Sequence, residues 1–143
     1  MSEIITFTHV GKPIPLQRPR FSRTGRVYNP NKCDQRDFAA NVEQFKPQTP
    51  LSGAIRITLK YVFKRPKSHF GTGRNSAILK SSAPRFHTTK PDVDNLVKFT
   101  LDAMNGVFFI DDKQVIDIRA TKVYGEDPAS IVSIFSLSSV SDL

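Results

Sequence analysis

The sequence has little cysteine and no long apolar run. Its one cysteine in 143 residues, Cys33, excludes an internal disulfide framework and suits a reducing cytoplasm. No apolar run approaches membrane-spanning length, and the segment MSEIITFTHV lacks the pattern of a secretory signal peptide. We therefore expect a single cytoplasmic domain over residues 1–143, with no membrane partner, that is long enough to bury a core without metal or disulfide staples.

Acidic residues are also scarce. Thirteen Asp and Glu stand against 21 Lys and Arg, which gives a net charge of +8 and favours a polyanionic partner, most often nucleic acid. The alternative is a soluble protein that is basic without a nucleic-acid partner. Every charged residue between positions 44 and 91 is basic, whereas eight of the thirteen acids fall between positions 92 and 127. This segregation indicates two surfaces with different roles, because a uniformly solvated surface intersperses the signs.

The hydrophobic pattern predicts an α/β (α+β) domain, with a small mixed β-sheet of about four strands and two principal helices. The expected strands cover residues 4–10, 54–63, 115–123 and 130–137, and the expected helices cover residues 31–45 and 94–104. Alternation in the second strand places Arg56, Thr58 and Lys60 on a basic outer face. The apolar run 107–110 is expected to be buried, and the tail 138–143 to fray.

Two basic segments, residues 11–30 and 64–91, are predicted to be loops. The first carries Phe21 and Tyr28 among its charges, so it either offers stacking faces to unpaired bases or is a solvated loop with two aromatics anchored in the core. The second is long enough to be functional or disordered, and it would form an arm over a DNA backbone. The residues expected to contact DNA are Lys12, Arg18, Arg20, Arg23, Arg26, Lys64, Arg65, Lys67, Arg74, Arg85 and Lys90.

A third segment, residues 90–115, concentrates five aspartates in this basic chain. Pro91 favours an extended entry, so Asp92 and Asp94 are expected at the start of a helix, where the helix dipole keeps carboxylates ionised. If the chain returns past that helix, Asp112 approaches them, and three carboxylates at one point require a cation. Oxygen ligands suit Mg²⁺ or Mn²⁺, the metals of phosphoryl chemistry.

Each acidic feature also has a structural alternative. Asp94 is compatible with an ordinary helix N-cap, and Asp94 with Lys98, four residues on, is compatible with a helix salt bridge. Asp111 and Asp112 are compatible with a simple turn before Lys113. His69 and His87 have no ligand-like spacing to Cys33 or to each other, which disfavours a zinc site.

Residues 90–123 contain the motif D-x-D-N-L-x-K, followed by D-A-M, a glycine and an apolar run ending in D-D-x-Q-V. This segment resembles the RusA family of Holliday-junction resolvases. Residues 11–20, G-K-P-x-P…R-P-R, are similar to RusA-like proteins of low-GC Gram-positive bacteria and their phages. The resemblance implies that Asp92, Asp94 and Asp112 are catalytic metal ligands, that Lys98 is a functional lysine, and that Asp111 supports the metal site.

The resemblance also implies an activity. Members are homodimeric endodeoxyribonucleases that need Mg²⁺ or Mn²⁺, use no organic cofactor, and resolve four-way DNA by paired nicks that leave ligatable ends. Two-fold symmetry of the junction suits two sites related by a two-fold axis. Two alternatives stay open: a non-catalytic DNA-binding module, and a nuclease that acts on other branched DNA.

Overall fold

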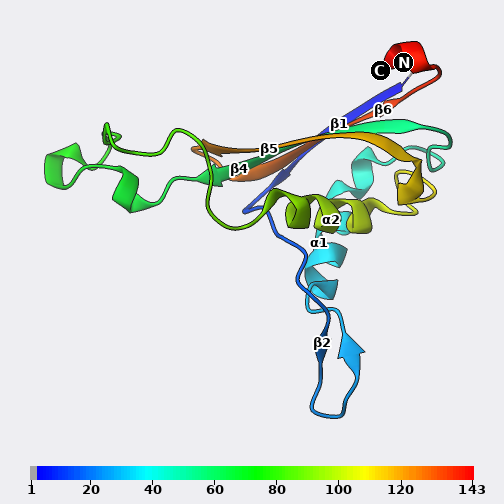
Figure 1. Cartoon of the computed structure of the whole chain (residues 1–143), viewed down its shortest axis with the longest axis horizontal. Helices are drawn as coiled ribbons and strands as arrows, with labels where there is room; N and C mark the ends of the chain where they lie inside the picture. Colours follow the sequence, from blue (N-terminus) through cyan, green and yellow to red (C-terminus); the bar gives the residue numbers. More distant parts are fainter. Residues whose placement is uncertain (1–2) are drawn as a thin grey trace.

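The computed structural model describes residues 3–143, and their side chains from residue 5 onward. Its main sheet contains β1 (Glu3–Val10), β4 (Ile55–Lys64), β5 (Val115–Gly125) and β6 (Ala129–Ser136), in the order β1-β6-β4-β5 (Figure 1). The β1–β6 and β6–β4 pairs are antiparallel, whereas β4 and β5 are parallel. The predicted α+β class with a mixed four-stranded sheet is therefore confirmed.

Strand β4 is central, and its alternating sequence buries one face. Ile55, Ile57 and Leu59 are almost inaccessible to solvent, as expected for apolar residues that share one face of a strand. The prediction of a basic outer face is wrong for Arg56, which is buried. Its Nε lies 2.7 Å from the Asp117 carboxylate on β5, so a cross-strand ion pair compensates its charge.

Two helices cover the same side of this sheet (Figure 1). They are α1 (Lys32–Val42), followed by the 3₁₀ turn η1 (Glu43–Phe45), and α2 (Val93–Met104). Apolar residues from both helices complete the core, and they include Phe38, Val42, Leu96, Phe99 and Met104. The packing of α2 on β4 includes a buried hydrogen bond, in which the Tyr61 and Thr100 hydroxyls lie 2.8 Å apart.

The first predicted loop contains a hairpin. Strands β2 (Arg20–Phe21) and β3 (Val27–Tyr28) pair in antiparallel register, and the hairpin projects away from the body of the protein (Figure 1). Gly25 adopts φ +81° at its turn, a conformation in which a side chain is strained. The hairpin contradicts the loop prediction for this part of residues 11–30.

The second predicted loop, residues 64–91, extends beyond one end of the sheet (Figure 1). It contains only the short 3₁₀ turns η2 (Lys67–His69) and η3 (Gly73–Asn75), together with an isolated antiparallel bridge between Phe70 and Leu79. The described chain is therefore irregular here, as predicted, but it is folded locally by these turns.

Two smaller predictions need correction. In the apolar run 107–110, Phe108 and Phe109 are buried, but Ile110 is 61% exposed. The tail 138–143, which was predicted to fray, contains the 3₁₀ turn η5 (Val140–Asp142). The Asp142 carboxylate accepts hydrogen bonds from the backbone N–H groups of Ser138 and Ser139, which hold its pKa well below the usual range. Within residues 3–143, no helix has the length and apolar character needed to cross a membrane.

Candidate active site

The N-terminal end of α2 presents two exposed carboxylates. Asp92 occupies the N-cap position and Asp94 lies in the first turn. The Asp92 side chain makes no capping hydrogen bond, and in residues 3–143 neither carboxylate has an ion-pair partner. The entry to the helix is fixed instead by Lys122 of β5, whose Nζ donates to the carbonyl oxygens of Thr89 and Pro91, both at 2.8 Å. Both carboxylates are therefore available to an external cation.

Asp111 and Asp112 lie beyond the C-terminal end of α2, after a turn in which Gly106 has φ +79°. Asp111 caps the 3₁₀ turn η4 (Asp112–Gln114): its Oδ1 accepts from the Lys113 N–H, and its own N–H donates to the Gln114 Oε1. The amide of Gln114 also donates to two carbonyls in the segment before β4, those of Leu51 and Gly53, each at 2.9 Å. Asp111 therefore has a structural role, whereas the Asp112 side chain is exposed.

The acids at this end of the helix interact electrostatically. A hydrogen bond with Asp111, followed by slight desolvation and the charges of Asp111 and Asp102, raises the pKa of Asp112. The backbone N–H of Lys113 and the hydrogen bond with Asp112 lower the pKa of Asp111. Partial burial raises the pKa of Asp102, against the opposing charge of Lys98. Asp102 therefore adds its negative charge to the acidic group at the C-terminal end of α2. The sequence motif did not indicate this interaction.

The expected approach of Asp112 to Asp92 and Asp94 is not found within one chain. Helix α2 has 12 residues, so its ends lie about 18 Å apart at ~1.5 Å per residue. Figure 1 shows η4 at the end of α2 opposite to the helix start. In the described part of the chain, no three His, Cys, Asp or Glu side chains group closely enough to hold a metal ion. One chain thus offers two separate acidic positions.

Lys98 lies on the exposed side of α2, between these two positions. No ion pair joins it to Asp94 within residues 3–143, so the proposed Asp94–Lys98 salt bridge is not formed. Its charge instead lowers the pKa of Asp102, one turn further along the helix. The ammonium group is therefore free to meet a ligand.

The residues expected to contact DNA fall into two groups. One lies on and before the projecting hairpin, and the other on the 64–91 loop. Their side chains are exposed except that of Arg65, which is half-buried and lies 4.4 Å from the Tyr124 ring centroid. Phe21 is 75% exposed and Tyr28 46%, which contradicts the alternative that these aromatics anchor the loop in the core. His87 stacks on Phe63 with ring centroids 4.1 Å apart.

Comparison with known proteins identifies the family of this chain. The sequence matches the family described as Endodeoxyribonuclease RusA over residues 11–135. It is also 34% identical to the uncharacterized protein YqaN of Bacillus subtilis (strain 168), in a comparison that covers 95% of this chain and 99% of that protein. The family match includes the hairpin, the 64–91 loop and Asp92, Asp94, Asp102, Asp111 and Asp112, and the chain therefore belongs to the RusA family of endodeoxyribonucleases.

Proposed function

We propose that this protein is a divalent-metal-dependent endonuclease that resolves four-way DNA junctions by paired nicks. The observation that carries the proposal is the presence, at both ends of α2, of exposed carboxylates that have no ion-pair partner within residues 3–143, in a member of an endodeoxyribonuclease family. The fold does not need Asp92, Asp94 or Asp112 for packing, because their side chains lie on the surface.

The donor set fits a hard cation. Asp92 and Asp94 supply carboxylate oxygens at one end of α2, and Asp112 supplies them at the other. Asp111 can support the metal through its second oxygen, because Oδ1 is engaged by the Lys113 N–H. The pKa of Asp112 is raised first by its hydrogen bond with Asp111 and by slight desolvation, and then by the negative charges of Asp111 and Asp102, a repulsion that a cation would relieve. Mg²⁺ or Mn²⁺, when bound, supplies an activated water and polarises a phosphoryl oxygen.

A homodimer brings the two acidic positions together. Two copies of α2 packed antiparallel about a two-fold axis place the N-terminal end of one helix beside the C-terminal end of the other. Each pair of ends then combines Asp92 and Asp94 of one copy with Asp112 of the second. This arrangement makes two metal sites, which suits paired nicks in a two-fold symmetric junction.

The surface near α2 is compatible with such a partner. Strand β5 is an edge strand of the main sheet, and it exposes Ile116 and Ile118. Ile110, between α2 and β5, is also exposed. Apolar side chains on an unpaired edge are a liability in a monomer, because they invite association. A second copy would cover them.

The remaining groups serve the DNA. Lys98 projects from the exposed side of α2, where its ammonium can neutralise charge that develops on the phosphate. The hairpin and the 64–91 loop supply the phosphate contacts that hold the substrate. Since the substrate is DNA, we place the protein in the cytoplasm of a bacterial or phage-infected cell.

The second candidate is a DNA-binding module without catalysis. The capping role of Asp111 favours it, because that carboxylate already has a structural task. The nuclease should cut DNA only when a divalent metal is present, whereas the binding module should not cut DNA at all. The test incubates a synthetic four-way junction, a flap and a matched duplex with Mg²⁺, with Mn²⁺ and with chelator. Metal-dependent cuts confined to the junction support resolution, cuts in the flap as well support a general branched-DNA nuclease, and intact but bound DNA supports the module.

A further inference from the structure

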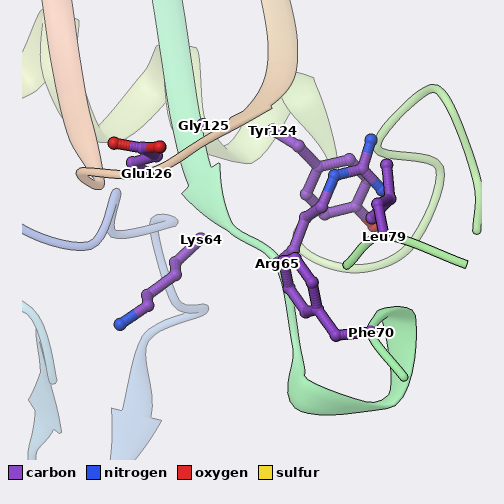
Figure 2. Close-up of a pocket in the computed structure, with 7 residues that line it drawn as sticks. All are labelled: Lys64, Arg65, Phe70, Leu79, Tyr124, Gly125 and Glu126. Carbon is purple, nitrogen blue, oxygen red and sulfur yellow. The ribbon is translucent and has the colours of Figure 1, made fainter. Parts of the chain in front are cut away.

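A pocket of about 450 Å³ opens where the 64–91 loop meets the ends of β4 and β5 (Figure 2). It is lined by Lys64, Arg65, Phe70, Leu79, Tyr124, Gly125 and Glu126. The pocket is far too small for a DNA duplex, but it is in the size range of sites that bind one small ring system. Neither the metal ligands nor the exposed arginines of the hairpin contribute to it.

The walls are held in place by specific contacts. The Phe70–Leu79 bridge is flanked by hydrogen bonds from Gly71 N–H to the Ile78 carbonyl and from Lys80 N–H to the His69 carbonyl, at 3.0 and 2.9 Å. The Arg65 guanidinium lies over the Tyr124 ring (Figure 2). It also donates to the Pro84 carbonyl at 2.6 Å. The pocket is therefore formed before any ligand arrives.

The lining selects a flat ring that carries a negative charge. Phe70 and Leu79 offer apolar surface, and the guanidinium plane of Arg65 is a second stacking face. Lys64 and Glu126 also line the pocket, but the Lys64 ammonium points away from Arg65, Phe70 and Leu79 (Figure 2), so Arg65 supplies the positive charge beside the ring. An apolar protein segment would leave the Arg65 guanidinium without a partner of opposite charge, whereas a nucleobase with its phosphate uses both the apolar surface and the cation.

The pocket lies at the same end of the sheet as Asp92 and Asp94. Tyr124 is two residues from Lys122 on β5, about 7 Å along the strand. Lys122 in turn binds the carbonyl of Pro91, the residue before Asp92. We propose that this pocket receives one unpaired base of the DNA strand whose neighbouring phosphate reaches the metal site. This inference rests on the proposed nuclease function and adds to it a subsite that reads an unpaired nucleotide.

The test measures binding with chelator present, so that cleavage plays no part. The probes are a four-way junction with one unpaired 2-aminopurine at the branch point and the same junction with an abasic site there. Wild type should bind the base-containing junction at least about fivefold more tightly, the lower end of what base stacking supplies. Phe70→Ala and Leu79→Ala should each abolish this preference. Ile78→Ala, beside Leu79 but outside the pocket, should retain it.

Two outcomes overturn the inference. One is equal wild-type affinity for the base-containing and abasic junctions. The other is an unchanged preference in both pocket variants. Leu79 is 45% exposed, so its replacement keeps the fold, and thermal melting verifies this for both variants. Wild-type cleavage of the ordinary junction with Mg²⁺ is scored separately, so loss of the base subsite and loss of the nuclease function are distinguishable.

Discussion

Asp92 stands at the N-terminal end of α2 and Asp112 lies beyond its C-terminal end, so that the whole helix, about 18 Å long, lies between them in a single chain. This relationship explains why the acidic motif forms no three-carboxylate group within one copy. The proposed metal site therefore needs carboxylates from two chains.

The carboxylates at both ends of α2 should be needed for cleavage. Asp92→Asn, Asp94→Asn and Asp112→Asn should each abolish nicking of a four-way junction, because an amide lacks the charge that holds a hard cation. Junction affinity, measured in chelator, should survive or tighten as repulsion of phosphate falls. Asp37→Asn, an exposed aspartate on α1, is the matched control and should cleave normally. Near wild-type nicking by any of the three variants would remove that residue from the ligand set.

Lys98 should act on the rate of cleavage and not on stability. Lys98→Met should lower single-turnover cleavage by about 10²-fold or more, as for other preorganised charged donors, while melting temperature and junction affinity barely change. Lys98→Arg should rescue only partly, because a planar fork replaces a compact charge. Lys32→Met, at an exposed lysine on α1, should have no effect. A Lys98→Met enzyme within threefold of wild type would leave Lys98 without a catalytic role.

The hairpin should contribute to affinity for every DNA. Replacing Arg20, Arg23 and Arg26 by Gln should weaken binding to junction and duplex alike, and it should reduce the salt slope by about one unit for each lost phosphate contact. Binding is measured as a function of salt concentration, with Arg36→Gln on α1 as the control. An unchanged slope would show that the hairpin arginines face away from DNA.

The two partners of the buried hydrogen bond between α2 and β4 should contribute unequally to the free energy of unfolding. Tyr61→Phe leaves the Thr100 hydroxyl donating to the Leu96 carbonyl at 3.0 Å, so it should cost about 0.5–1.5 kcal/mol of unfolding free energy. Thr100→Val leaves the Tyr61 hydroxyl buried without its partner and should cost about 1–3 kcal/mol. Urea denaturation of both variants measures the difference. The reverse order would mean that Tyr61 finds another partner.

The regular elements could be predicted because each carries enough residues to show its period. Strand β4 alternates over ten residues, and α2 combines an apolar face with the Asn105-Gly106 stop. Each strand of the hairpin has two residues, too few for any alternation. The burial of Arg56 also escaped prediction, because it depends on Asp117, which is brought opposite by the parallel pairing of β5.

The candidate site was only partly predictable for a similar reason. Local sequence places Asp92 and Asp94 at the helix start, and the structure agrees. The position of Asp112 instead depends on Gln114, which binds the carbonyls of Leu51 and Gly53, more than 60 positions earlier in the chain. A local sequence pattern cannot predict a contact over such a long separation in the chain. The separation of the two acidic positions is therefore visible only in the folded structure.

Mixing two inactive variants tests the shared site most directly. Asp92→Asn and Asp112→Asn are co-expressed with different tags, the hybrid dimer is purified, and a cruciform plasmid is incubated with it and Mg²⁺. If each site combines Asp92 and Asp94 of one copy with Asp112 of the other, the hybrid keeps one intact site and should nick the plasmid without linearising it. A hybrid of Asp92→Asn with Asp94→Asn should stay inactive, because both of its sites are damaged. An Asp92→Asn/Asp112→Asn hybrid as inactive as its parents would contradict a site shared between two chains.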